Sequence, residues 1–183
     1  MSIDQLEEEC RGCCLCALHS TRRNLVFGAG SPSARLMFVG EAPGQVEDET
    51  GVPFTGPAGK LLDDMLLVMG LERTDVYIAN ILKCRPPQNR DPSPEEQEAC
   101  IGWLRRQTAL IRPKLIVCLG RIAAGRLIHG DFKITKEHGA FVEKKGVLMT
   151  AIYHPAALLR DERKLPETFE DLKRIERKLA ELS

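Results

Sequence analysis

Residues 35–44 read Arg35-Leu36-Met37-Phe38-Val39-Gly40-Glu41-Ala42-Pro43-Gly44, which is a continuous apolar run followed by a polar turn. A run of this kind is typical of a parallel strand that helices cover on both faces. In folds built on such strands, ligands bind beyond the carboxyl ends of the strands. The stretch therefore predicts a buried strand over residues 35–40, with the Glu41 turn at the edge where a functional site is expected.

Three further apolar runs, over residues 76–80, 115–120 and 147–154, predict strands that accompany the first. Helical patterns fill the gaps and predict helices over residues 60–69, after a Ser93-Pro94 cap, over 121–128 and over 166–182. Strands that alternate with helices indicate an α/β fold. We expect a three-layer α/β/α sandwich around a central four-stranded parallel sheet.

The length and composition indicate an ordinary globular protein. The chain has 183 residues, 43% hydrophobic and 28% charged, which suits one domain over residues 1–183. No apolar run is long enough to span a membrane, and the acidic N-terminus lacks the features of a signal peptide. A cytoplasmic monomer without membrane association is therefore expected. Because the formal net charge is zero, bulk charge alone does not indicate a nucleic-acid partner.

The cysteines predict a metal centre. Cys13-x-x-Cys16 lies near the N-terminus, and Cys84 and Cys100 form a wider pair downstream. Thiolate ligands suit zinc or an iron–sulfur cluster. One CxxC pair followed by two distant cysteines favours a [4Fe–4S] cluster, with zinc as the alternative. Local spacing does not decide whether the pair is Cys13-x-x-Cys16 or Cys10-x-x-Cys13.

Side chains able to do chemistry follow three of the predicted strands. The first strand ends at Glu41, the second at Asn80 and the fourth at His154. The Glu41 turn can present backbone N–H groups and a carboxylate to a cleft. In the Gly- and Pro-rich loop over residues 51–59, Phe54 is the one aromatic residue and can stack on a base.

The segment after the fourth strand reads His154-Pro155-Ala156-Ala157-Leu158-Leu159-Arg160. Its leucines are expected to lie exposed on a turn unless they bury into something. An apolar wedge on a loop can separate a base from its stack, and Arg160 can contact phosphate.

Taken together, these stretches resemble the family 4 uracil-DNA glycosylases, the iron–sulfur branch of the uracil-DNA glycosylase superfamily. The resemblance runs from about residue 13 to residue 160 and covers most of the chain. It rests on motifs in the family's order and approximate spacing: Cys13-x-x-Cys16, Val26-Phe27-Gly28, Gly40-Glu41-Ala42-Pro43-Gly44, residues 51–59, Asn80-Ile81-Leu82-Lys83-Cys84-Arg85-Pro86-Pro87-Gln88-Asn89-Arg90, Cys100 and His154-Pro155.

The resemblance implies an activity and a cofactor. The activity is hydrolysis of the N-glycosidic bond of uracil-containing DNA by a monofunctional enzyme, which releases uracil and leaves an abasic site. The [4Fe–4S] cluster would be bound by Cys13, Cys16, Cys84 and Cys100.

The resemblance also implies residue roles. His154 and the backbone of the Glu41-Ala42 turn would donate to uracil O2, and Asn80 would read the O4/N3 edge. Glu41 is the candidate for handling the attacking water, with Glu47 and Asn89 helping to position it. Glu47 could instead crowd the uracil C5 position and exclude thymine, and the sequence does not separate these roles. For the flipped base and the DNA, the roles fall to three residues: Phe54 would stack on the base, Leu158 would fill the gap in the duplex, and Arg160 would bind the backbone.

Ala42 motivates an alternative. In other branches of the superfamily an Asp or Asn occupies the corresponding position, and an alanine cannot activate water. A non-catalytic iron–sulfur DNA-binding module therefore stays open as the runner-up. A redox or radical enzyme is a weaker alternative, because four cysteine ligands leave no open iron site.

Overall fold

The computed structural model describes residues 1–182, and its sheet has six strands in the order β1-β3-β2-β4-β6-β5. The strands are β1 (Ala29–Gly30), β2 (Leu36–Gly40), β3 (Tyr77–Asn80), β4 (Leu115–Leu119), β5 (Val142–Lys144) and β6 (Val147–Ile152). β3, β2, β4 and β6 pair in parallel, whereas β1 and β5 are antiparallel edges.

The four predicted parallel strands are confirmed as the centre of the sheet. The prediction of a sheet with four strands is wrong, because β1 and β5 extend it to six. Neither edge strand carries a continuous apolar run: β1 has two residues, and β5 is exposed or half-buried. Edge strands face solvent and need no such run, so the apolar pattern could not reveal them.

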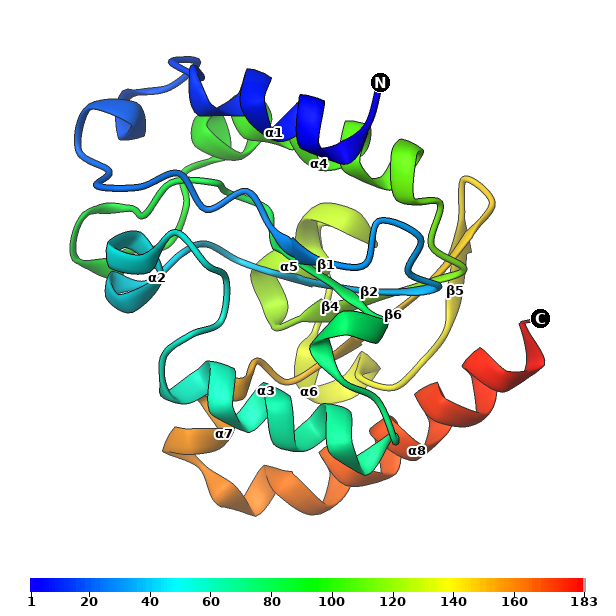
Figure 1. The fold of residues 1–183 in the computed structure, drawn as a ribbon. Helices are drawn as coiled ribbons and strands as arrows, with labels where there is room; N and C mark the ends of the chain where they lie inside the picture. Colours follow the sequence, from blue (N-terminus) through cyan, green and yellow to red (C-terminus); the bar gives the residue numbers. More distant parts are fainter. Residues whose placement is uncertain (183) are drawn as a thin grey trace.

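Helices cover both faces of the sheet (Figure 1). They are α1 (Ile3–Arg11), α2 (Gln45–Thr50), α3 (Pro57–Val68), α4 (Pro94–Ile111), α5 (Arg121–Leu127), α6 (Ile134–Glu137), α7 (Pro155–Arg160) and α8 (Leu165–Glu181). Short 3₁₀ helices lie at Ala17–Ser20, Arg73–Asp75, Pro87–Asn89 and Glu162–Lys164. α1 and α4 lie on one side of the sheet, and α3, α7 and α8 lie on the other, so the α/β/α architecture is confirmed.

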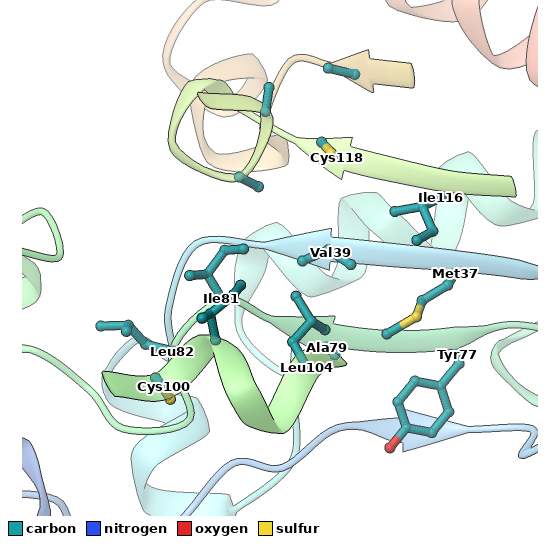
Figure 2. Packing of buried hydrophobic residues seen from close by; sticks show 14 of the residues in the cluster. Met37, Val39, Tyr77, Ala79, Ile81, Leu82, Cys100, Leu104, Ile116 and Cys118 are labelled. Carbon is teal, nitrogen blue, oxygen red and sulfur yellow. The ribbon is translucent and has the colours of Figure 1, made fainter. Parts of the chain in front are cut away.

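Side chains of the central strands alternate between two cores, as the period of a β-strand requires. One core joins strand residues to α4 and α5: Met37, Val39, Tyr77, Ala79, Ile116, Cys118, Ile101, Leu104, Ala123 and Ala124 (Figure 2). The other joins the opposite strand face to α3, α7 and α8: Leu36, Phe38, Ile78, Val117, Ile152, Leu62, Met65, Leu158, Leu172 and Ile175. Burial on both faces explains why the central strands are continuously apolar.

The predicted cap of α4 is confirmed. Ser93 Oγ accepts a hydrogen bond from the Glu96 backbone N–H at 3.1 Å, and Glu96 Oε2 accepts one from the Ser93 N–H at 2.9 Å. This capping box satisfies two backbone donors that the first turn would leave unpaired. It fixes where α4 begins, and therefore where Cys100 lies two turns later. Among the helices over residues 1–182, none is long and apolar enough to cross a membrane.

Candidate active site and metal centre

The carboxyl ends of the central strands open onto one cleft of about 460 Å³. Its lining comes from the turn after β2, α2, the loop after β3, the start of α5, and the segment from the end of β6 through α7: Glu41, Ala42, Pro43, Gly44, Glu47, Asn89, Arg90, Asp91, Gly120, Arg121, Tyr153, His154, Ala157 and Arg160. Of the residues that the strand-end argument selected, the structure brings Glu41 and His154 together in this cleft, whereas Asn80 is not part of its lining. Parallel strands place their ends at one edge, and this explains the convergence.

Asn80 and Phe54 meet beside this cleft at Gly40. A Cβ atom on Gly40 would lie 2.5 Å from Asn80 Oδ1 and 2.7 Å from the Phe54 ring, so only glycine leaves room for both side chains. Asn80 is 2% exposed, and its Oδ1 is one of two buried side-chain polar atoms without a hydrogen-bond partner within residues 1–182. An unpaired buried acceptor is costly, and a bound ligand that donates a hydrogen bond would remove that cost.

Phe54 is held in an unusual backbone conformation. Its φ of 52° lies in the left-handed region, which costs an aromatic residue on the order of 1–3 kcal/mol. The Arg73 guanidinium secures it by donating to the carbonyls of Pro53 at 2.9 Å and of Phe54, while Arg73 Nε pairs with Asp63 at 2.5 Å. The Phe54 ring centroid lies 5.7 Å from that of His154. The strained residue therefore lies next to His154 and Gly40, with its side chain only 6% exposed.

His154 follows β6 and caps α7. Its Nδ1 accepts a hydrogen bond from the Ala156 backbone N–H at 3.0 Å, so a neutral ring carries its proton on Nε2. Burial, with a smaller effect from the Arg160 charge, lowers the pKa of His154 to about 4. At neutral pH the ring is therefore a neutral hydrogen-bond donor at Nε2.

Glu41 lies half-buried in the turn after β2. Burial raises the pKa of its carboxyl above the ordinary value of 4.5, and the Asp91 carboxylate raises it further, while Arg121 opposes the shift. Across residues 1–182, no hydrogen bond to the Glu41 carboxylate is present, so its oxygens remain available to a ligand or water. A carboxylate with a raised pKa beside a cleft is a candidate for proton transfer.

Glu47 and Asn89 also line the cleft, but other residues hold them. Glu47 Oε1 accepts from the Gly44 N–H at 3.1 Å, and Glu47 Oε2 accepts from the Thr55 hydroxyl at 3.4 Å. Asn89 is exposed and its Oδ1 accepts from Arg85 Nε at 2.7 Å. Glu47 thus stabilises the loop that carries Phe54, and Glu41 has the freer carboxylate.

The structure corrects the expectation for Leu158. This residue is 0% exposed and packs in the core with α3 and α8, so it cannot enter a DNA duplex. Leu159 is 48% exposed, and Arg160 is exposed at the rim of the cleft. Neighbouring positions on a helix point about 100° apart, so one leucine faces the core and the next faces solvent. Leu159 is therefore the apolar side chain that can act as a wedge.

The second feature of the site is a cavity lined by Cys13, Cys16, Cys84 and Cys100. The first two flank the turn after α1, Cys84 follows β3, and Cys100 lies on α4. Cys10, the alternative ligand, is 0% exposed and packs with Leu6 and Phe27 instead. The geometry therefore favours the pair Cys13-x-x-Cys16.

Three of the cavity sulfurs accept hydrogen bonds. Arg22 donates to Cys84 Sγ at 3.2 Å, the Trp103 indole N–H donates to Cys13 Sγ at 3.3 Å, and the Lys83 backbone N–H donates to Cys100 Sγ at 3.3 Å. Such donors stabilise thiolates, and hydrogen bonds to sulfur are typical of iron–sulfur sites. Burial raises the pKa of the Cys100 thiol to about 11, so a bound metal is needed to keep it deprotonated at neutral pH.

A single metal ion and a cluster make different demands on the four cysteines. Within residues 1–182, no group of three or more His, Cys, Asp or Glu side chains is placed to hold one ion. Four thiolates around one zinc ion would crowd within bonding distance of a common centre, at about 2.3 Å each. A [4Fe–4S] cluster takes one thiolate at each of four iron atoms, which requires ligands set farther apart.

Sequence reasoning missed several residues of the site. Arg121 and Asp91 form an ion pair at 2.7 Å within the cleft, and both act on the pKa of Glu41. Arg121 follows the end of the third predicted strand, so the strand-end rule could have found it. Arg73 could not have been found, because only the folded chain brings it to the Phe54 loop.

Comparison with known proteins places these features in a family context. The family model described as the Uracil DNA glycosylase superfamily matches residues 27–180. The type-4 uracil-DNA glycosylase of Archaeoglobus fulgidus is 49% identical over 182 residues, covering 95% of this chain and 92% of that protein. The type-4 enzymes of Sulfurisphaera tokodaii and Thermotoga maritima are 45% and 44% identical, covering 95% and 87% of this chain and 83% and 84% of their own lengths.

Proposed function

The chain belongs to the uracil-DNA glycosylase superfamily, and we propose that its cleft excises uracil from DNA by hydrolysing the N-glycosidic bond. Free uracil leaves and an abasic site remains, as a monofunctional glycosylase in DNA repair requires. The observation that carries this proposal is the buried, unpartnered Asn80 Oδ1 beside the Phe54 ring and the neutral His154. Together they supply an acceptor, a stacking face and a donor for one planar base.

Recognition follows from these groups. A uracil flipped out of the helix would stack on Phe54. Asn80 Oδ1 would accept from uracil N3–H, and the Asn80 amide would donate to O4. Cytosine carries an amino group in place of O4 and lacks the N3 proton, so it would meet an unpaired acceptor and donor.

The bond breaks as uracil departs with its electron pair. His154 Nε2–H would donate to uracil O2, where negative charge develops, and the backbone of the Glu41-Ala42 turn would assist. Because His154 is neutral, it stabilises the anion by hydrogen bonding without needing to transfer a proton. The Glu41 carboxylate would stabilise the positive charge that develops on the sugar. The attacking water would then bond to C1′ and lose its proton to Glu41.

Glu47 and Asn89 have supporting roles in this proposal. Glu47 would hold the loop that presents Phe54, and Asn89 would line the path of the DNA on the segment that follows Cys84. Leu159 replaces Leu158 as the wedge that fills the gap in the duplex, with Arg160 on the phosphate backbone.

We propose that Cys13, Cys16, Cys84 and Cys100 hold a [4Fe–4S] cluster. The lining of one cavity by all four cysteines and the donors to three of their sulfurs support it. With four protein ligands the group offers no open coordination site, so its contribution is to anchor the loop after β3. Residues 1–183 would form one domain in the cytoplasm, and a single copy would be active, since one chain lines the whole cleft.

The deciding experiment measures release of free uracil from a uracil-containing oligonucleotide without added metal or nucleotide. Wild type should release uracil, and Glu41→Gln and His154→Ala should each lose at least about a hundredfold in single-turnover rate. Glu143→Gln and His129→Ala, exposed residues outside the cleft, are the matched controls and should match wild type. Tight DNA binding by a wild type that releases no uracil would favour the non-catalytic binding module. Full activity in both cleft variants would refute the residue roles.

A further inference from the structure

Lys83 is a buried cation that the proposed chemistry does not use. Its side chain is 1% exposed, although lysine is among the residues least often buried. Its Nζ donates to the Asn80 carbonyl at 3.0 Å and to Gln107 Oε1 at 2.7 Å, and it lies 5.8 Å from the centre of the Phe27 ring. Over residues 1–182, no carboxylate forms an ion pair with it. Such placement is costly and calls for a function.

The backbone of Lys83 belongs to the loop that follows β3 and carries Cys84, here called the metal loop. Its N–H donates to Cys100 Sγ at 3.3 Å, and its carbonyl accepts from the Val26 N–H at 2.9 Å. Lys83 also directly precedes Cys84 in the chain. One residue therefore contacts the metal centre through its backbone and the end of β3 through its side chain.

Gln107 extends this connection along β3. It lies on α4 about two turns after Cys100, so both face the same side of the helix. Its Nε2 donates to the Phe27 carbonyl at 2.9 Å and to the Tyr77 hydroxyl at 3.2 Å. Tyr77 begins β3 and Asn80 ends it, and Figure 2 shows Tyr77 and Cys100 in the same core. Lys83 and Gln107 thus connect both ends of β3 to α4 by hydrogen bonds.

The position of the Asn80 side chain depends on these hydrogen bonds. Within residues 1–182 its Oδ1 accepts no hydrogen bond, so the amide is positioned by packing beside Gly40 and Phe54 and by the backbone whose carbonyl Lys83 binds. We propose that Lys83 is a positioning residue, which transmits the fixed geometry of the metal loop to the uracil-reading amide of Asn80. This inference rests on the proposed function of Asn80.

The test is a double-mutant cycle between Lys83→Met and Asn80→Ala, with iron content measured for every protein. Methionine keeps the apolar stem of lysine and removes the two hydrogen bonds. Lys114→Met, at the opposite end of the sheet, replaces an exposed lysine and is the matched control. The assays are single-turnover uracil release, DNA affinity, and iron and sulfide per chain.

Lys83→Met should retain the iron of wild type and bind DNA within about twofold, yet excise uracil ten- to hundredfold more slowly, as a misplaced contact group predicts. In the Asn80→Ala background the same change should cost less than about twofold, because Lys83 acts through Asn80. Gln107→Met should show a smaller loss in the same direction, and it serves as the second variant if Lys83→Met does not fold.

Three results would overturn the proposal. The first is a Lys83→Met rate equal to wild type, and the second is fully additive losses in the cycle. The third is loss of iron in step with activity, which would make Lys83 a residue of the metal centre alone. Failure of wild type to release uracil would refute the proposed function instead, so the two failures are distinguishable.

Discussion

The adjacent leucines of α7 offer the sharpest test of how this structure assigns roles. Leu158→Ala removes a fully buried side chain from the core between α3, α7 and α8. Leucine-to-alanine changes in such cores cost about 2–5 kcal/mol. For a protein of this size, each kcal/mol shifts Tm by roughly 2–4 °C. A loss of about 3 kcal/mol therefore predicts a fall in Tm of roughly 6–12 °C for Leu158→Ala.

Leu159→Ala should behave in the opposite way. This side chain is 48% exposed, and a surface change of this kind alters stability by no more than about 0.5 kcal/mol. Its Tm should stay within about 2 °C of wild type. Because an apolar wedge compensates for the unstacking that base flipping costs, excision from duplex DNA should fall about tenfold. Excision from single-stranded DNA, which has no gap to fill, should change less than about twofold.

Thermal unfolding followed by circular dichroism, together with uracil release from matched duplex and single-stranded substrates, separates the two residues. Both measurements should be made below the Tm of the less stable variant. Equal Tm losses in both variants would show that Leu159 is also buried. A duplex-specific defect in Leu158→Ala but not in Leu159→Ala would refute the exchange of roles that the structure implies.

The remaining predictions concern Glu41, Asn80 and the cysteine ligands. The raised pKa of Glu41 places the acid limb of the single-turnover rate above pH 4.5: the rate should fall as pH drops and the carboxylate protonates, and Glu41→Gln should abolish the limb. His154, with a pKa of about 4, should stay neutral over that limb. Asn80→Asp replaces the amide donor to uracil O4 by an acceptor, and competition assays should show at least a tenfold loss of uracil excision. Cys100→Ala should lose iron and visible absorption, whereas Cys118→Ala, a buried thiol outside the metal cavity, should retain both.

The sequence predicted the central sheet because its strands are buried on both faces. A strand such as β2 is apolar at every position, and that pattern is visible without any knowledge of its neighbours. The edge strands β1 and β5 lack this constraint and were not predicted. The Ser93 cap was predictable for a similar reason, since its hydrogen bonds are made within four residues.

The strand-end rule located Glu41, Asn80 and His154, because the topology alone brings the carboxyl ends of parallel strands together. It could not orient the side chains. The choice between Leu158 and Leu159 depends on the rotational phase of a helix only six residues long, which local sequence does not set. Nothing in the sequence indicates that Lys83 is buried, because its burial depends on acceptors from Asn80 and from Gln107, 24 residues downstream.

The cysteine cavity is connected to the Glu41 turn through the loop after β3, and this connection indicates what the proposed cluster would contribute. The loop after β3 carries Cys84 at one end and, at its other end, binds the Glu41 turn: the Ile81 N–H donates to the Gly40 carbonyl at 2.9 Å, and the Leu82 N–H donates to the Glu41 carbonyl at 3.1 Å. Movement of this loop would therefore shift Glu41 as well as Asn80. A small displacement of either group lowers the rate steeply, since the reacting atoms must be held within a fraction of an ångström. A closed thiolate centre acts through position, so we expect its loss to slow excision.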